Sequence, residues 1–335
     1  MALKPPVEVP QGAIRLNTDS QKLEFFAQDQ WWEMVTEVAA PIGNRGVFCG
    51  GYASGASSPK TTNTIDYLSM TTGGQAVDFG DAVAANQDKA MLASRTRALI
   101  LDGSTNAIDY ITIATAGNAI AFGQSIHHNQ NRSNGLSSQV RGVFAGEQNA
   151  PTGSNAVDYS TIASLGNTID FGDLTANAHS PGTGGSPTRG IITNITPSGY
   201  NGNGIDYITI ASTGNAQDFG DTVNANETYK TAGSSNSIRM VDVGGGSPTP
   251  DLQVEFITIA TLGNGTDFGD LTDGTNCRGG GASSSIRAVV AGGNDPNTNI
   301  DELMFATGGH AVKFGDLTYV ENRHAGGTSN CHGGI

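Results

Sequence analysis

The sequence contains few cysteines and no long apolar run. Its three cysteines are too few, and odd in number, for a disulfide framework, so we expect buried or half-buried thiols at Cys49, Cys277 and Cys331. No stretch of about 18 apolar residues occurs, so we expect no membrane-spanning helix. The first residues lack the apolar core of a secretory signal. No long 3.6-residue periodicity is found, which excludes a solenoid of helix pairs.

Positive charge is also scarce, because 17 Lys and Arg residues stand against 31 Asp and Glu residues. Phosphate contacts need clustered Lys and Arg, so this balance argues against nucleic acid and anionic membranes as partners. The H-E-x-x-H, P-loop and G-x-S-x-G signatures are missing from the sequence. We therefore assign no catalytic, cofactor-binding or metal-binding residue and expect a protein that is not an enzyme. A glycan hydrolase is the alternative, since it needs only two carboxylates.

Glycine is abundant, with 47 residues, and it lies in a repeated pattern. The pair Phe-Gly recurs at intervals of about 40 to 50 residues, a period typical of propellers, solenoids and tandem arrays. A strand-like IDY segment precedes each pair, and an Arg followed by small and apolar residues lies further upstream. The phenylalanines are Phe79, Phe122, Phe171, Phe219, Phe268 and Phe314, and the arginines are Arg45, Arg97, Arg141, Arg189, Arg239 and Arg287.

Each repeat is interpreted as four β-strands. The segment IDYITIA is rich in β-branched and aromatic residues, and it is apolar on both faces, which is typical of a sheet covered on both sides. Gly-Asn or Gly-Gly turns separate it from the strand that ends in DFGD. We expect the six phenylalanines to be buried between sheets, the six arginines to pair with acidic residues, and the FGD aspartates to accept backbone N–H bonds in turns.

The repeats resemble those of kelch-type propellers. The Gly50-Gly51 and Gly292-Gly293 pairs match the kelch double glycine, although Phe stands where kelch repeats carry Trp. The resemblance covers about residues 45–332 and implies an all-β, six-bladed kelch-like β-propeller at 45–335. A surplus Gly/Ser segment near the end, RHAGGTSN, is expected to pair with RGVFCGG and close the first blade, which removes two sheet edges.

Residues 1–44 lie outside the repeat and are predicted to form a short β-hairpin attachment module of three strands. The series Gly12, Ile14, Arg15, Asn17-Thr18-Asp19-Ser20, Glu24 and Trp31 resembles a segment of bacteriophage tail-fibre and other virion proteins. The repeat is also similar to repeats in proteins of marine phages and cyanophages. Exposed aromatic residues of this density are typical of an interface, so we expect Phe25, Phe26, Trp31 and Trp32 to bind other virion proteins.

These resemblances imply a non-enzymatic structural protein of a phage virion, oligomeric in the particle and associated with the tail or a tail fibre. Its expected role is host-surface adhesion or capping of the particle. The alternatives are a virion-borne propeller that binds or cleaves carbohydrate, and a cellular kelch-type scaffold for protein interactions, which would not need residues 1–44.

The expected receptor site follows from loop length. Successive strands of a blade are antiparallel, so the long, variable loops share one face and the short turns share the other. Binding residues are usually placed on such variable loops. We expect the attachment module on the short-turn side and a host glycan or protein on the long-loop side. The candidate receptor-face residues are Tyr52, His127, His128, Tyr200, Tyr229 and Tyr319.

Overall fold

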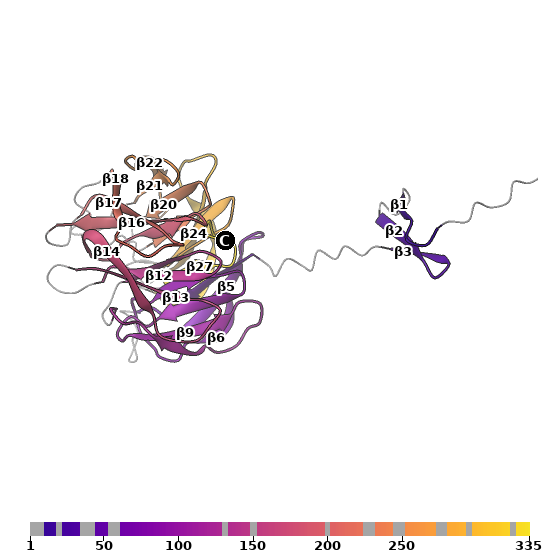
Figure 1. The fold of residues 1–335 in the computed structure, drawn as a ribbon, viewed down its shortest axis with the longest axis horizontal. Helices are drawn as coiled ribbons and strands as arrows, with labels where there is room; N and C mark the ends of the chain where they lie inside the picture. Colours follow the sequence, from indigo (N-terminus) through magenta and orange to yellow (C-terminus); the bar gives the residue numbers. More distant parts are fainter. Residues whose placement is uncertain are drawn as a thin grey trace, which may run out of the picture. The chain divides into compact units, whose positions relative to one another are not determined.

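The computed structural model is all-β in the residues that it describes (Figure 1). None of these residues belongs to a helix long and apolar enough to cross a membrane. The chain separates into two compact bodies, Met1–Ile42 and Gly43–Ile335, called here the N-terminal and C-terminal bodies. The described residues are 10–17, 22–33, 44–52, 61–128, 133–147, 153–197, 202–223, 232–243, 252–272, 280–292, 297–321 and 326–335.

The N-terminal body contains the three short strands expected from the sequence. These are β1 (Ile14–Asn17), β2 (Lys22–Ala27) and β3 (Gln30–Glu33), paired as an antiparallel sheet in the order β1-β2-β3. Gln28 and Asp29 connect β2 to β3 with φ of 51° and 60°. Two positive φ angles are those of a type I′ turn, whose twist matches that of the paired strands.

Within the described residues of the C-terminal body, the strands form six antiparallel groups of four, called here sheets 1 to 6. Each begins with a short strand of three or four residues, followed by the Arg strand, the IDY strand and the FGD strand. Sheet 1 is β27 (Gly326–Ser329), β4 (Arg45–Cys49), β5 (Thr64–Ser69) and β6 (Val77–Asp81). Sheet 2 is β7 (Ala90–Ala93), β8 (Arg97–Leu101), β9 (Ala107–Thr112) and β10 (Ile120–Gln124). Sheet 3 is β11 (Asn134–Ser137), β12 (Arg141–Ala145), β13 (Ser154–Thr161) and β14 (Ile169–Ala178).

The remaining sheets follow the same plan. Sheet 4 is β15 (Thr183–Gly185), β16 (Arg189–Thr196), β17 (Gly204–Thr209) and β18 (Gln217–Asp221). Sheet 5 is β19 (Ala232–Ser235), β20 (Arg239–Val243), β21 (Gln253–Thr258) and β22 (Thr266–Asp270). Sheet 6 is β23 (Gly280–Ser283), β24 (Arg287–Ala291), β25 (Asn297–Met304) and β26 (Val312–Glu321). Sheets 3 and 4 are joined, because the long strand β14 also pairs with β16 through Asn177↔Thr196 and Ala178↔Ile195.

The first strands of the sheets contact one another in a closed circuit. Strand β7 contacts β11, and the contacts continue through β15, β19 and β23 to β27, which contacts β7 again. Strand β27 pairs antiparallel with β4, from Gly326↔Cys49 to Ser329↔Gly46, as the surplus Gly/Ser segment predicted. The architecture is therefore one of four-stranded antiparallel sheets around a shared centre, and it is compatible with a propeller.

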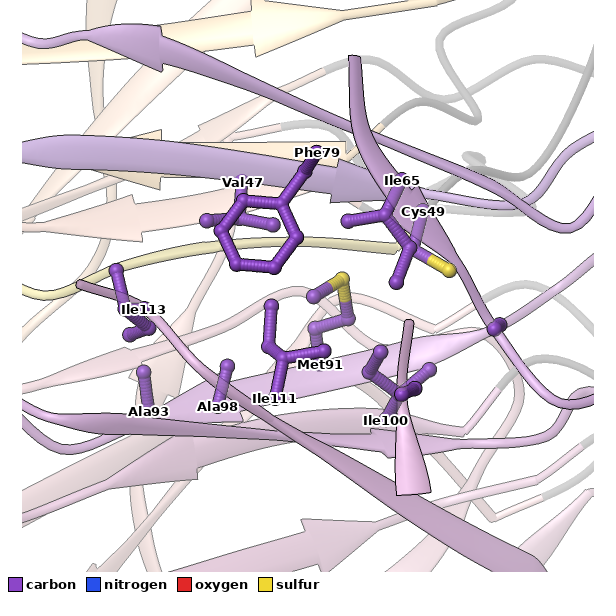
Figure 2. Close-up of a cluster of buried hydrophobic side chains, with 12 residues drawn as sticks. Val47, Cys49, Ile65, Phe79, Met91, Ala93, Ala98, Ile100, Ile111 and Ile113 are labelled. Atoms are coloured by element: carbon purple, nitrogen blue, oxygen red, sulfur yellow. The ribbon is translucent and has the colours of Figure 1, made fainter. Parts of the chain in front are cut away.

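The hydrophobic core lies between neighbouring sheets. In the cluster of Figure 2, Val47, Ile65 and Phe79 of sheet 1 pack with Ile100 and Ile111 of sheet 2. The expectation for the six Phe-Gly phenylalanines is confirmed, because each is at most 9% exposed. Five of them meet an aromatic ring of their own IDY strand edge to face at about 6 Å, a favourable geometry for ring pairs. Burying each phenylalanine contributes about 1.5–3 kcal/mol.

Candidate functional site

The repeated decapeptides, such as GNTIDFGDLT in sheet 3, bind each other head to tail. At the junction of sheets 3 and 4, the amides of Gly214 and Ala216 donate to the carbonyls of Phe171 and Asp173, each over 2.8 Å. The same pair of bonds occurs at every junction. The last one closes the circuit, because the amides of Gly74 and Ala76 in sheet 1 donate to Phe314 and Asp316 in sheet 6.

Glycine is required at these junctions because two backbones nearly touch. Gly172 has a φ of +140°, and a Cβ placed there would lie 2.7 Å from the carbonyl of Gly214. Gly214 has a φ of +148° but faces open space. The Asn that follows Gly in the turn adds a third bond, since Oδ1 of Asn215 accepts from the amide of Asp173 over 3.2 Å. The Gly-Asn and Phe-Gly parts of the repeat are thus the two halves of one inter-sheet contact.

The acidic residue of the IDY segment makes a second link between sheets. Asp206 of sheet 4 accepts the amide and the hydroxyl of Thr175, which follows FGD in sheet 3, and each bond is 2.7 Å. Asp66 and Thr318 make the same pair of bonds between sheets 1 and 6. Burial raises the pKa of Asp66 and Asp206, and the threonine bonds offset only part of this effect.

The repeated arginines differ from the expectation that they pair with acidic residues. Five of the six donate instead to a backbone carbonyl of the next sheet; Arg141 Nη1, for example, lies 2.9 Å from Ile210 O. The guanidinium of Arg141 also lies over the Tyr159 ring, 4.4 Å from its centre. Arg287 is the exception and binds Glu302 over 2.7 Å. The accepting carbonyls lie at the end of the next IDY strand, where a planar guanidinium can reach them while stacking on the aromatic ring of its own sheet.

The expectation for the FGD aspartates is also corrected. The backbone amides of Asp81, Asp173 and Asp221 donate to the Asn side chain of the next sheet, and the amide of Asp270 donates to His310 Nδ1. The carboxylate of Asp316 accepts from side chains, Gln75, Thr298 and Lys313, and the Lys313 bond holds its pKa below the usual range. The repeated residues therefore maintain the scaffold, and a functional site has to be sought among residues that differ between repeats.

Three of the candidate receptor-face residues are at least partly accessible. His127 is exposed and lies 3.4 Å from Asp170. Tyr52 is half-buried, and its backbone forms an isolated antiparallel β-bridge with Thr61. Tyr319 is half-buried, packs against the cluster around Phe48, and donates its hydroxyl to Gly50 O over 2.9 Å. Tyr200 and Tyr229 lie outside the described residues.

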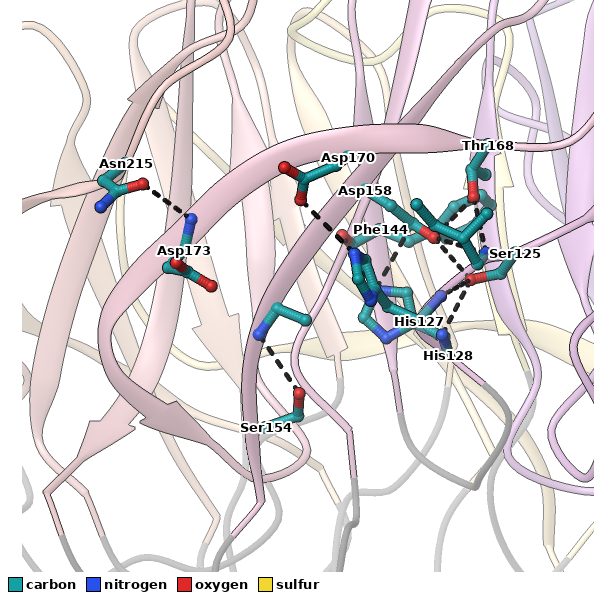
Figure 3. A network of polar contacts seen from close by, with 12 residues as sticks. Ser125, His127, His128, Phe144, Ser154, Asp158, Thr168, Asp170, Asp173 and Asn215 are labelled. Atoms are coloured by element: carbon teal, nitrogen blue, oxygen red, sulfur yellow. Dashed lines mark hydrogen bonds and ion pairs between the residues drawn. The ribbon is translucent and has the colours of Figure 1, made fainter.

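His128 does not point outward as expected. Its side chain is fully buried, with Nε2 3.2 Å from Phe144 O and 3.4 Å from Asp158 Oδ1 (Figure 3). Ser125 anchors this loop by donating to Asp158 and accepting the His128 amide. The loop thus turns inward at its second histidine because sheet 3 supplies a buried carboxylate. Within the described residues, no group of three or more His, Cys, Asp or Glu side chains could hold a metal ion.

A buried ion pair in sheet 2 was not expected from the sequence. Lys89 Nζ lies 3.0 Å from Asp102 Oδ1, and the two side chains are 1% and 4% exposed. Asn86 donates to both carboxylate oxygens, and Thr105 donates to Oδ2. The sequence signal is that Asp102-Gly103 replaces a double glycine, which provides a carboxylate where other repeats have none. The pair is fully hydrogen-bonded on the carboxylate side, which suits a structural role.

The centre of the C-terminal body holds a small cavity of about 40 Å³ lined by the first strands of all six sheets. This volume admits a few water molecules and no sugar or nucleotide. At one end of the cavity, serine hydroxyls link the strands to their neighbours: Ser137 donates to Ala93 O, Ser235 to Gly185 O, Ser283 to Ser235 O and Ser329 to Ser283 O. The ends of the first strands therefore lie at one level.

Residues 330–335 cover this serine end of the cavity. The Gly333 amide donates to Ser235 O over 2.7 Å, and Arg45 and Asn330 exchange two bonds. The half-buried His332 donates from Nε2 to Ala93 O over 2.9 Å and accepts the Gly334 amide at Nδ1, which fixes one neutral tautomer. Burial lowers the pKa of His332. Cys49 and Cys331 are free thiols, and burial raises the pKa of Cys331 to about 11.

In the N-terminal body, two of the four predicted attachment residues have described side chains. Phe26 and Trp31 meet edge to face with ring centres 5.3 Å apart, and Arg15 lies over Trp31 at 4.1 Å while its Nε binds Glu24 over 2.8 Å. Phe25 and Trp32 pair across β2 and β3, and their side chains lie outside the described part. The three-stranded sheet thus carries a cation–π contact beside an aromatic pair.

Comparison with known proteins does not assign the chain to a family. No protein-family model matches the chain, and no curated protein matches it significantly.

Proposed function

We propose that residues 45–335 form a six-bladed, kelch-like β-propeller in a non-enzymatic structural protein of a bacteriophage virion. Its proposed place is the tail or a tail fibre, and its proposed role is host-surface adhesion or capping of the particle. Residues 1–44 bind other virion proteins in this proposal. The resemblance of residues 12–31 to virion proteins supports the location, and the closed circuit of strand contacts supports the propeller.

The main support for the proposal is that the repeated polar residues form contacts between neighbouring sheets. Arg141, Asp206 and Asn215 illustrate three residue types that are all occupied in joining neighbouring sheets. A scaffold of this kind leaves recognition to the loops that differ between repeats, such as the one that carries His127. Adhesion requires only surface chemistry on those loops and no pair of catalytic groups, so it fits the arrangement better than catalysis does.

The location is tested on virions of a phage whose genome encodes the chain. Gold-labelled antibodies against residues 45–335 should mark the tail or its fibres in electron micrographs. If the protein is missing from purified particles, the virion assignment is wrong and a cellular scaffold becomes the better explanation.

Adhesion and hydrolysis are separated by a second experiment. The labelled full chain should adsorb to host cells, and replacing the long loops with Gly-Ser segments should abolish adsorption. Incubation with host polysaccharide should release no oligosaccharides. Release of oligosaccharides would instead establish the carbohydrate-cleaving alternative, and unchanged adsorption of the loop variant would remove the long-loop face as the receptor site.

A further inference from the structure

Sheet 4 has a polar hollow at its surface, called here the sheet 4 hollow. It lies at the hairpin between β17 and β18, has a volume of about 420 Å³, and is lined by Arg189, residues 207–209, residues 212–215 and Gln217. Binding sites for small molecules have volumes of about 300–1,000 Å³. The sheet 4 hollow is therefore large enough to hold a small ligand.

Sheet 4 differs from the other sheets at two positions of this hollow. Thr213 and Gln217 both have polar side chains, whereas every other repeat has a residue without a polar side chain at one or both of the equivalent positions. The equivalents of Thr213 are Thr72, Ala116, Leu165, Leu262 and Gly308, and those of Gln217 are Val77, Ile120, Ile169, Thr266 and Val312. Because the residues shared by the repeats join neighbouring sheets, a departure confined to one repeat points to a local role.

Two side-chain amides in the hollow are held in place by bonds within the protein. Gln217 Oε1 accepts the hydroxyl of Tyr207, which leaves the Gln217 Nε2 group to donate to a ligand. Asn215 Oδ1 accepts the Asp173 amide over 3.2 Å, which leaves the Asn215 Nδ2 group in the same way. Side chains that are already ordered lose little rotamer freedom on binding, and this favours affinity.

Arg189 keeps its role in the scaffold and also forms one wall of the hollow. Its Nη1 donates to Ile259 O over 2.8 Å and to Ala260 O over 3.0 Å, and its guanidinium lies 4.7 Å from the centre of the Tyr207 ring. Only Nη1 takes part in these bonds, so Nε and Nη2 retain N–H groups that a ligand oxygen can accept.

The chemistry of the hollow suits a neutral ligand that is rich in hydroxyl groups. The exposed hydroxyls of Thr209, Ser212 and Thr213 can each donate and accept hydrogen bonds. None of the described residues that line the hollow is Asp or Glu, so it lacks the carboxylates that attract cations. The exposed Asp218 follows Gln217, and the chain has a net charge of −14; both disfavour an anionic ligand.

We propose that the sheet 4 hollow binds a neutral saccharide. The hydroxyl groups of a sugar both donate and accept hydrogen bonds, which matches the amides, hydroxyls and guanidinium of the lining. Thr213 and Gln217 give sheet 4 this property, because Arg189 and Tyr207 have counterparts in other sheets. The inference does not rest on the proposed function, since the hollow lies at a hairpin turn, away from the long loops, and requires no place in a virion.

The test measures binding of the full chain to four neutral disaccharides, maltose, lactose, cellobiose and N,N′-diacetylchitobiose, by isothermal titration calorimetry. At least one of them should bind, with an affinity that changes little with ionic strength because no ion pair is formed. Sialyllactose, which adds a carboxylate to lactose, should bind no more tightly than the best neutral sugar. Failure of all four neutral sugars to bind, or tighter binding of sialyllactose than of each of them, would overturn the proposal.

Two reciprocal variants locate the site, because sheet 3 has the same arginine, tyrosine, serine and asparagine around its own hairpin. Thr213→Leu/Gln217→Ile gives sheet 4 the side chains of sheet 3 and should weaken binding by at least about tenfold. Leu165→Thr/Ile169→Gln gives sheet 3 the side chains of sheet 4 and should add one binding site per chain. Both variants should fold, since each new residue occurs at the equivalent position of another repeat. Unchanged affinity in the first variant, or an unchanged number of sites in the second, would refute the assignment.

Discussion

Replacing Gly172 with alanine tests the head-to-tail contact most directly, because the chain contains a matched control. Gly172 and Gly214 face each other across one junction and have nearly the same φ, +140° and +148°. The strain of an alanine at such angles is about 1–3 kcal/mol at either position. Only at Gly172 does the new methyl group meet a backbone, 2.7 Å from Gly214, whereas at Gly214 nothing lies within 4 Å.

The difference between the two variants isolates the cost of separating the sheets. Overpacking costs about 1–3 kcal/mol, so Gly172→Ala should destabilise the protein by about 2–6 kcal/mol in total and Gly214→Ala by about 1–3 kcal/mol. Each kcal/mol should lower Tm by about 2–4 °C. Both tryptophans lie in the N-terminal body, so unfolding should be followed by calorimetry or circular dichroism. Equal melting temperatures for the two variants would refute the close-contact argument.

Four further changes test other parts of the scaffold. Phe171→Ala should lower the free energy of unfolding by about 3–5 kcal/mol, and a loss below about 1 kcal/mol in urea unfolding would contradict its burial. Removing residues 326–335 should expose the edge of β4 and lower Tm sharply, and an unchanged calorimetric transition would argue against closure. Lys89→Met should cost about 3–5 kcal/mol because it leaves Asp102 buried without its cation; a variant as stable as the parent in urea unfolding would contradict a stabilising role for this ion pair. Burial lowers the pKa of His332 from 6.5, so the unfolded state binds the proton more readily, and stability should fall as the pH drops below about 6.5. His332→Gln should flatten that part of the pH profile of Tm.

The arrangement of the strands could be predicted because the same pattern of strand-forming segments occurs six times in the sequence. The spacing of Phe171 and Phe219, with an IDY segment and an Arg strand before each, fixes four strands per repeat and the burial of phenylalanine. The pairing of RHAGGTSN with RGVFCGG followed from counting strands at the two ends of the repeat. Repetition averages out local ambiguity, so periodicity was a better guide here than the propensity of any single segment.

Side-chain partners were less predictable, because the repeated pattern does not determine which side-chain atoms form hydrogen bonds with the neighbouring sheet. Arg141 was expected to find a carboxylate but reaches a carbonyl, since the end of the next IDY strand leaves an acceptor within its reach. His128 was expected outward, because adjacent histidines in a loop are usually solvated, but Asp158 draws the second one inward. The buried pair of Lys89 and Asp102 depends on one departure from the double glycine.

The head-to-tail decapeptides have a consequence for how the C-terminal body unfolds. In an open array of repeats the end units have one neighbour and fray first, so stability is graded along the chain. Here the amide of Gly74 donates to Phe314, so the sheet that contains the first Arg strand has two neighbours like every other. Loosening any one sheet must break two junctions together. The junction amides, such as those of Gly74 and Gly214, should therefore exchange with deuterium at similar slow rates, in a single cooperative opening.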